Sequence, residues 1–217
     1  METKDIRQIY SILEKEVKKF DNPFAESVHE KYKDPFFVLV ATILSARTLD
    51  KTTAKVCEKL FKEIKGINDL EKISVGKLEK LLYPVGFYKT KAKHLKELPK
   101  VVKEKFNGKV PEEIEQLLEL PGVGRKTANL VVSVAFNKPG ICVDTHVHRI
   151  TNILGIVKTK TPLETEMKLR EILPKDLWNK TNYVFVLLGQ NVCFSRKPNC
   201  SACPIQKHCP IGKKLRN

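Results

Sequence analysis

The sequence predicts an all-α protein. Apolar residues recur at helical spacing through most of the 217 residues, and sustained period-2 alternation, which marks half-buried strands, is absent. The connections are short, and the chain has no low-complexity tract, no Gly/Ser linker and no long repeat. A chain of this length can bury a substantial core as one domain or as two small ones. We therefore expect a compact helical protein that is compatible with two lobes.

Two helices are predicted at the start of the chain. Asp34-Pro35 is a start signal, because aspartate accepts backbone N–H bonds at an N-cap and proline fits the first turn. The run that follows, residues 36–46, is apolar on most sides, which indicates a helix buried in the core. An earlier helix is predicted from apolar residues that share one face: Ile6, Ile9, Leu13, Val17 and Phe20.

Four further helices are predicted up to residue 120. Asp50 stands where it can cap the first of them. The inward face of that helix is expected to carry Val56, Leu60, Phe61 and Ile64. The other three cover residues 74–82, 90–106 and 111–120, and each is bounded by proline or glycine.

Three more helices are predicted after residue 140. An apolar stretch, residues 140–143, leads to Asp144, which is a natural N-cap for the helix that follows. Thr161-Pro162, with Glu164 in the first turn, opens the next helix. The last long helix is predicted over residues 176–192.

The composition is that of a folded, strongly basic chain. It contains 40 Lys+Arg against 25 Asp+Glu, a formal net charge of +15, and 41% hydrophobic residues. This charge favours a polyanionic partner, of which nucleic acid is the commonest, although a solvated lysine surface accounts for the charge equally well. No run of about 18 apolar residues and no amphipathic segment that sets Trp or Phe against Lys is present, so no membrane partner is expected.

Four of the six cysteines form a C-x6-C-x2-C-x5-C pattern near the C-terminus. The first residues, Met1 to Asp5, lack the apolar core of a secretory signal, so reduced thiols that hold a metal are favoured over disulfides. Zinc sites usually pair two short knuckles, and here only one exists. An iron–sulfur cube is wider and also takes four thiolates, so the spacing favours the cluster over zinc. The predicted ligands are Cys193, Cys200, Cys203 and Cys209.

A second motif, Leu120-Pro121-Gly122-Val123-Gly124-Arg125-Lys126-Thr127-Ala128, joins two predicted helices. Its two glycines permit a tight turn with positive φ. Backbone N–H groups of the turn and of the next helix then gather in one place, which suits a DNA phosphate that is bound without any base being read. A plain tight turn between helices is the alternative reading, and the basic pair Arg125-Lys126 favours the phosphate.

The third motif is Val143-Asp144-Thr145-His146-Val147-His148-Arg149. Asp144 is either a simple helix cap or a functional carboxylate whose charge is stabilised by a helix N-terminus. His146 and His148 lie two apart on a helix and should diverge, so they are read as ordinary polar histidines rather than as metal ligands.

Taken together, the three motifs resemble the endonuclease III family of DNA glycosylases, which belongs to the helix–hairpin–helix superfamily. Their order and spacing match over roughly residues 5 to 211. The segment Leu44-Ser45-Ala46-Arg47-Thr48-Leu49-Asp50 resembles the family's L-S-x-Q-x-x-D, and Gly86-Phe87-Tyr88 followed by Lys91-Ala92 resembles its G-x-Y…K-A loop. Three motifs in one order make the resemblance specific.

The resemblance implies a two-lobed helix–hairpin–helix glycosylase fold. A six-helix barrel domain would span residues 28–138 and contain the hairpin at about 111–130. Residues 1–27 and 139–217 would form an iron–sulfur domain, with a 4Fe-4S cluster on the four cysteines, and DNA would lie across the cleft. The family further implies a monomer that acts on double-stranded DNA containing damaged bases or abasic sites, in a prokaryotic-type, nucleoid-associated cytoplasmic setting.

The resemblance also implies a bifunctional DNA glycosylase/AP lyase of base excision repair that removes oxidised pyrimidines and nicks the strand by β-elimination. Lys126 matches the nucleophile that forms a Schiff base, and Asp144 matches the aspartate that stabilises developing positive charge. Related adenine glycosylases carry Ser in place of Lys126 and a Glu near Thr42, and thymine-mismatch enzymes carry Tyr in place of Lys126. Two alternatives remain: a monofunctional uracil or mismatched-thymine glycosylase, and a non-catalytic DNA-binding iron–sulfur protein.

Arg47 departs from the bacterial pattern, which has a glutamine that fills the gap left by the flipped base. The arginine either fills that gap and contacts the orphaned purine or turns to a phosphate. Phe87 matches the family's second wedge position, with a core phenylalanine as the alternative. The other candidate DNA contacts are Pro121, Gly122, Val123, Gly124, Arg125, His146, Arg196 and Lys197.

Overall fold

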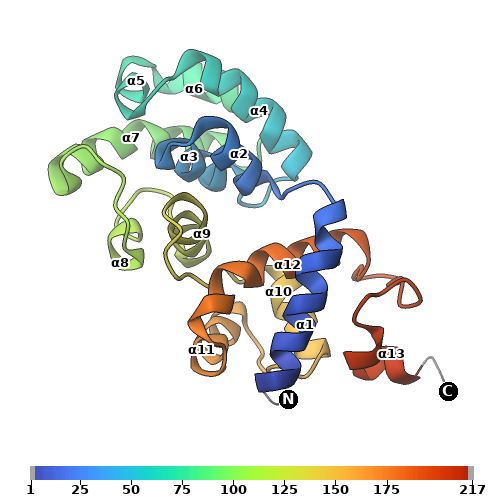
Figure 1. Cartoon of the computed structure of the whole chain (residues 1–217). Helices are drawn as coiled ribbons and strands as arrows, with labels where there is room; N and C mark the ends of the chain where they lie inside the picture. Colours follow the sequence, from blue (N-terminus) through green and yellow to red (C-terminus); the bar gives the residue numbers. More distant parts are fainter. Residues whose placement is uncertain (1–2, 215–217) are drawn as a thin grey trace. The chain divides into compact units, whose positions relative to one another are not determined.

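The computed structural model of the chain describes residues 3–214, and all regular structure in this range is helical, as the sequence predicts (Figure 1). Met1 and Glu2, the first two residues of the segment that is read as lacking a secretory signal, lie outside the described residues. The chain divides into two compact units, residues 24–138 and residues 1–23 with 139–217. The domain boundary expected at residue 28 falls inside helix α2 (Phe24–Tyr32). None of the described helices combines the length and apolarity that crossing a membrane requires.

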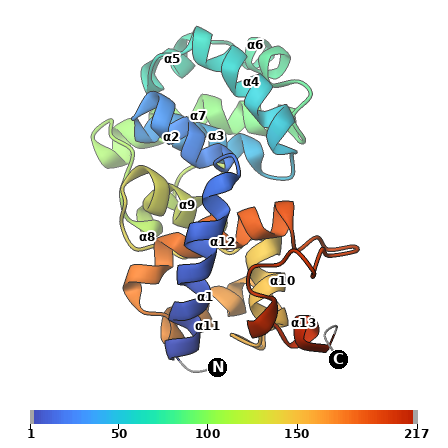
Figure 2. The same cartoon turned by 45° about the vertical axis from the view of Figure 1, so that its right-hand side comes forward.

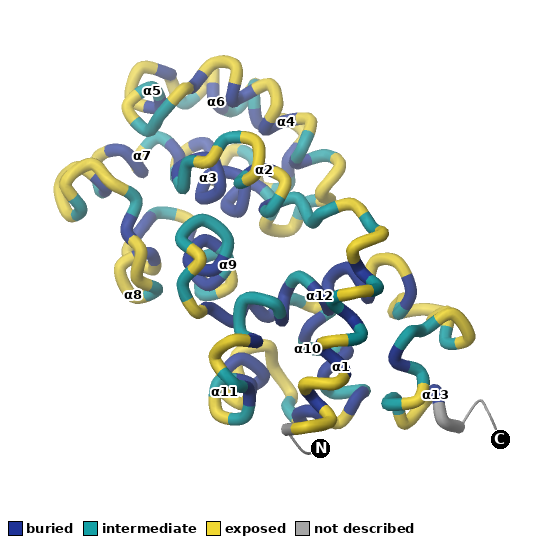
Figure 3. Tube along the Cα trace, in the orientation of Figure 1, coloured by how far each residue is buried: buried dark blue, intermediate teal, exposed yellow. Residues whose placement is uncertain are grey.

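Helix α3 (Pro35–Ser45) is the centre of the unit formed by residues 24–138 (Figure 1). Asp34 caps it as predicted, because its carboxylate accepts the Phe36 N–H at 2.8 Å. Every residue from Phe36 to Leu44 is buried, which explains why this helix is apolar on most sides (Figure 3). Around it pack α2, α4 (Asp50–Glu63), α7 (Tyr88–Phe106) and α9 (Arg125–Ala135).

Several boundaries in this unit differ from the prediction. Asp50 is the first residue of α4 rather than its cap, since Leu49 occupies the cap position without a side-chain bond. The helix expected over 111–120 shrinks to α8 (Ile114–Leu117), because Glu113 is extended and the residues after α8 form tight three-residue turns. Helix α6 (Val75–Leu82) was predicted, whereas α2 and α5 (Ile67–Lys72) were not.

In the other unit, α12 (Trp178–Asn191) packs against both α1 (Thr3–Glu16) and α10 (Thr145–Ile153) (Figure 2). The Tyr10 and Thr181 hydroxyls meet at 2.9 Å, and the Tyr10 ring packs edge-on against Phe185. Apolar residues of all three helices form the core of the unit: Ile9, Leu13, Val147, Ile150, Val184 and Leu188.

Of the two other helices predicted in this unit, one begins at its predicted cap and one begins later than expected. Helix α11 (Pro162–Ile172) begins after Thr161, whose hydroxyl accepts the Glu164 N–H at 3.2 Å. The predicted start of the last long helix at residue 176 is wrong, because Asp176 lies in a 3-10 turn, η2 (Lys175–Leu177), and α12 begins after it. Short segments complete the unit: η1 (Val17–Lys19), η3 (Gln206–His208) and α13 (Pro210–Lys214).

Candidate DNA repair site

The glycine hairpin connects α8 to α9. Gly122 has a φ of 76°, and a Cβ at this position would lie only 2.6 Å from His94 Nδ1, so the turn requires glycine there. Gly124 differs from the expectation of positive φ, because its φ is −100°. A Cβ on Gly124 would meet nothing within 4 Å, so the space above this residue is open. Gly122 therefore shapes the turn, while Gly124 leaves its backbone approachable.

Lys126 lies in the first turn of α9 and is exposed. No capping side chain bonds to the first-turn N–H groups of this helix. Its ammonium group makes no hydrogen bond or ion pair with any residue that the structure describes. The start of α9 therefore presents a primary amine at the positive end of a helix, where an anionic substrate is attracted.

Asp144 is the N-cap of α10, as predicted. Its Oδ1 atom accepts the N–H groups of both His146 and Val147 at 2.9 Å. Both bonds use the same oxygen, and Oδ2 has no bonding partner in the described part of the chain. The cap thus fixes the orientation of the carboxylate and leaves Oδ2 available to interact with a substrate. Lys126 and Asp144 belong to different units.

The two histidines of this helix make different contacts. The imidazole of His146 fills the space that a side chain at Gly189 of α12 would need. The Nδ1 atom of His148 lies 2.7 Å from the Thr165 hydroxyl on α11. They therefore contact different helices and do not share a ligand position.

Arg47 and Phe87, 40 positions apart in the sequence, are brought together. The guanidinium carbon of Arg47 lies 5.5 Å from the centre of the Phe87 ring. Phe87 is 62% exposed, so the alternative of a core phenylalanine is wrong. Both residues have positive φ, 54° and 58°, a conformation that costs a non-glycine residue roughly 1–2 kcal/mol. Strained backbone of this kind concentrates at functional sites.

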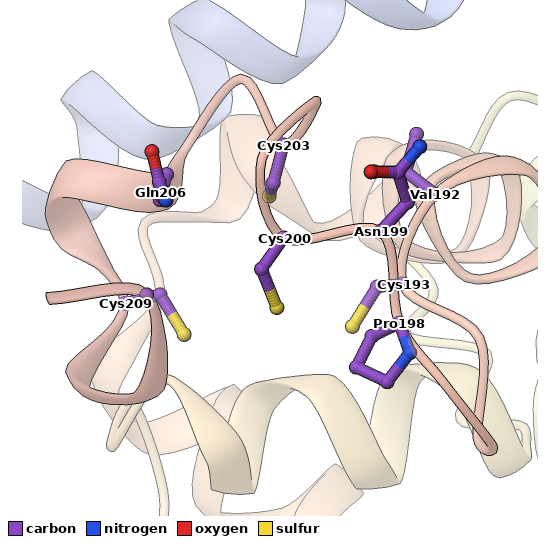
Figure 4. Close-up of a pocket in the computed structure, with 9 residues that line it drawn as sticks. Val192, Cys193, Pro198, Asn199, Cys200, Cys203, Gln206 and Cys209 are labelled. Atoms are coloured by element: carbon purple, nitrogen blue, oxygen red, sulfur yellow. The ribbon is translucent and has the colours of Figure 1, made fainter. Parts of the chain in front are cut away.

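The four cysteines of the C-terminal pattern line one pocket, together with Val192, Pro198, Asn199, Gln206 and Gly212. Figure 4 shows their sulfur atoms turned toward a common space. All are free thiols, and burial, reinforced by the neighbouring cysteines, raises the pKa of Cys203 to about 11. No group of three or more His, Cys, Asp or Glu side chains in the described residues is arranged to hold a single metal ion.

Sequence reasoning missed the contact between Arg149 and this pocket. One guanidinium nitrogen of Arg149 donates to Cys193 Sγ at 3.4 Å, and the other donates to the Cys193 carbonyl at 2.5 Å. Arg149 ends the motif that begins at Val143, but nothing in that motif points to Cys193, which lies 44 positions later. Arg196 and Lys197, in the loop between the first two cysteines, are both exposed. Two exposed basic side chains, Arg196 and Lys197, therefore lie in the loop beside the thiol pocket.

Residues 40–175 match the model of the family described as HhH-GPD superfamily base excision DNA repair protein. The chain is 46% identical over 186 residues to Endonuclease III of Thermotoga maritima, which covers 86% of this chain and 87% of that relative. It is similar along its full length to a non-covalent Endonuclease III–DNA complex, with a TM-score of 0.88, 36% identity and 100% of both chains covered. A trapped Endonuclease III–DNA covalent intermediate matches with a TM-score of 0.84 and 38% identity, over 97% of this chain and 98% of that one. The chain therefore belongs to the endonuclease III family of the HhH-GPD superfamily of base excision DNA repair proteins.

Proposed function

We propose that this protein removes oxidised pyrimidines from duplex DNA and then nicks the strand, with Lys126 as nucleophile and Asp144 as its carboxylate partner. The broader activity, DNA glycosylase and AP lyase of base excision repair, follows from membership in the endonuclease III family. The observation that carries the residue assignment is the exposed, unpaired Lys126 amine at a helix start that lacks a capping side chain, within the described residues. Ser or Tyr at this position would offer no amine.

The chemistry follows from these two groups once the damaged base has left the stack. The uncharged Lys126 amine attacks C1′ of the sugar, and the base departs with the electrons of the N-glycosidic bond and takes up a proton. Asp144 stabilises the positive charge that develops at C1′ and accepts a proton from the lysine. The C1′–O4′ bond of the sugar ring then opens, O4′ takes up a proton, and the lysine nitrogen and C1′ form the Schiff base. This Schiff base acidifies the C2′ proton, and loss of that proton expels the 3′ phosphate, which breaks the strand.

Substrate DNA is held by backbone and basic groups rather than by base reading. The open space above Gly124 admits a phosphate to the turn and to the start of α9, which Pro121, Val123 and Arg125 frame. His146, next to the Asp144 cap, and the exposed Arg196 and Lys197 add further contacts to the DNA.

We infer that the four-cysteine pocket holds a 4Fe-4S cluster. Zinc needs four ligand atoms within about 2.3 Å of one ion, whereas the cube accepts thiolates that are spaced more widely. The four thiols that line one pocket are the set of ligands that such a cluster takes. When bound, the cluster would cross-link the loop that carries Arg196 and Lys197 through its cysteine ligands. Arg149 stabilises the Cys193 ligand by donating to its sulfur.

The same proposal covers the setting in which the enzyme works. We propose a monomer; the chain itself carries the proposed nucleophile, carboxylate and thiol pocket, so a second copy would add none of them. Its substrate is the chromosome, so we place it in the cytoplasm with the nucleoid.

Borohydride trapping on damaged duplexes tests the assignment. Duplexes with thymine glycol, dihydrouracil, uracil or an abasic site are incubated with enzyme, and base release, nicking and covalent trapping are scored separately. Lys126→Gln should lose trapping and nicking but still bind damaged DNA. Lys109→Gln, which removes another exposed lysine of the same unit, is the matched control and should behave as wild type.

Each other outcome contradicts a specific part of the proposal. Base release without nicking by the wild type would show a monofunctional glycosylase. Binding without release would show a non-catalytic DNA-binding protein. Nicking by Lys126→Gln at the native rate would remove Lys126 from the mechanism.

A further inference from the structure

Lys91 is a buried lysine for which the reaction has no use. Only 6% of the residue is exposed. It lies in the first turn of α7, close in sequence to Phe87. Its ammonium group donates to the carbonyls of Leu44 at 2.8 Å and Ala46 at 2.6 Å. A third contact, 3.3 Å long, joins it to the Thr48 hydroxyl. The three N–H donors of a charged lysine are thereby all used.

The segment held by Lys91 is a tight turn with an unusual residue at its tip. Thr48 N–H donates to the Ser45 carbonyl at 3.0 Å, and Ala46 has φ −55° and ψ 120°. With the positive φ of Arg47, these values match a type II turn, whose third position normally takes glycine or asparagine. In a type I turn the central peptide is turned over and the third residue takes a negative φ. Arg47 is therefore held in the turn type that is less favourable for a residue with a side chain.

The Lys91 contact to Ala46 explains why the turn does not relax. The Ala46 carbonyl belongs to the central peptide, which is the group that points in opposite directions in the two turn types. A bond of 2.6 Å from a buried ammonium to this oxygen holds the peptide in the type II orientation. Burial lowers the pKa of Lys91 to about 8, which shows that the charged form is disfavoured at this position apart from its hydrogen bonds.

The loop that carries Phe87 is joined to the turn that carries Arg47 through Thr48. The Thr48 hydroxyl accepts the Gly86 N–H at 3.1 Å, and Gly86 immediately precedes Phe87. A Cβ on Gly86 would lie 2.7 Å from the Arg47 carbonyl, so the two backbones touch and only glycine fits. Phe87 in turn stands at the tip of a turn closed by the Tyr88 N–H, which donates to the Val85 carbonyl at 3.1 Å.

We propose that Lys91 is a positioning residue that locks the Arg47 and Phe87 turns together, so that both side chains enter the DNA as one rigid wedge. The inference rests on the proposed function, because it assigns the tips of both loops to DNA opening. Without the clamp, the Arg47 peptide turns over, the guanidinium leaves the Phe87 ring, and the wedge becomes disordered. Chemistry at Lys126 is expected to remain, since the hydrogen bonds of the Lys91 ammonium group go to Leu44, Ala46 and Thr48 and not to the hairpin.

Paired and bulged lesions separate wedge function from chemistry. Base release is measured in single turnover with thymine glycol either paired in a duplex or unpaired in a one-nucleotide bulge, where the base is already unstacked. Lys91→Met should slow release from the paired lesion on the order of 10-fold to 100-fold, as expected for a misplaced group, and slow the bulged lesion far less. Lys91→Arg, which keeps the donors, should recover part of the loss.

Lys96 supplies the matched control on the same helix. Its ammonium group also donates to two carbonyls, Glu71 at 2.6 Å and Ile73 at 2.8 Å, at the end of α5 and away from the wedge. Lys96→Met should leave both substrates unchanged. Thr48→Val, which removes only the linking hydroxyl, should reproduce the paired-lesion loss in milder form and decides the matter if Lys91→Met does not fold.

A binding measurement needs no catalysis. A duplex with a tetrahydrofuran abasic analogue opposite 2-aminopurine reports wedge insertion through increased fluorescence. The wild type and Lys96→Met should give the increase, and Lys91→Met should lose most of it. Equal losses on paired and bulged lesions, or full fluorescence in Lys91→Met, would reject the clamp. A wild type that inserts its wedge but never releases base would instead reject the proposed function and leave the clamp in place.

Discussion

Asp144→Asn separates the two roles that the cap of α10 can have. The substitution keeps an oxygen acceptor for the His146 and Val147 N–H groups, both bonded at 2.9 Å, and removes only the negative charge. Asparagine and aspartate are about equally good N-caps, so stability should change by no more than a few tenths of a kcal/mol. Base release should fall by about 10²-fold or more, because the charge that stabilises C1′ is lost.

Asp144→Ala provides the scale for the cap itself. Alanine leaves two helix N–H groups without their acceptor, which costs about 1 kcal/mol and lowers the Tm of a chain this long by roughly 2–4 °C. Thermal unfolding followed by circular dichroism measures this shift, and single-turnover release of thymine glycol measures the chemistry.

Asp34, the N-cap of α3, is the control for Asp144, since its carboxylate also caps a helix by accepting the Phe36 N–H at 2.8 Å. Asp34→Ala should lower the Tm to a similar degree while the folded enzyme releases base at the native rate. If Asp144→Asn releases base within about threefold of wild type, Asp144 is only a cap, and the carboxylate assignment fails.

Three further predictions concern other parts of the chain. Burial raises the pKa of Glu26 from 4.5 to about 7, so the folded state keeps a proton that the unfolded state loses. Stability should therefore fall by on the order of 3 kcal/mol between about pH 5 and pH 7, and urea unfolding of Glu26→Gln should show no such loss. Arg47→Ala should weaken excision most opposite guanine, by about 1–3 kcal/mol, if Arg47 contacts the orphaned base. Equal losses opposite all four bases, with a salt slope shallower by about one counterion, would instead assign Arg47 to a phosphate. Purified protein should be yellow-brown and contain about four irons per chain. Cys203→Ser should lose this iron and Cys57→Ser should keep it, whereas stoichiometric zinc in a colourless protein would contradict the cluster.

The helix starts that the sequence predicts well are those with local capping chemistry. Asp34, Asp144 and Thr161 each bond to N–H groups two or three residues ahead, so the signal lies within one turn of the chain. Asp50 carries the same signal but lies inside its helix, because Leu49 takes the cap position. Helix α5 went unpredicted because it is short and only Leu70 of its residues is buried, which leaves little periodicity to detect.

The candidate site shows the same division between local and distant information. The hairpin and the cysteine pattern are continuous motifs, so their shapes could be anticipated from spacing. The Arg47–Phe87 contact and the burial of Lys91 depend on two turns some 40 residues apart, and no local pattern encodes their meeting. The Arg149 bond to Cys193 spans 44 positions and was missed for the same reason.

The division of the chain also sets an order of assembly. Helix α1 precedes residues 24–138 in the sequence, yet its partner Thr181 on α12 lies 171 positions after Tyr10, so Tyr10 has no native partner there until α12 has also been synthesised. Residues 24–138 form a continuous unit and can complete their core during that wait. Closing so long a loop adds entropy cost before any packing energy is gained, which makes the docking of α1 a late and slow event. The apolar face of α1 is thus the part of the nascent protein with the longest need for protection from aggregation.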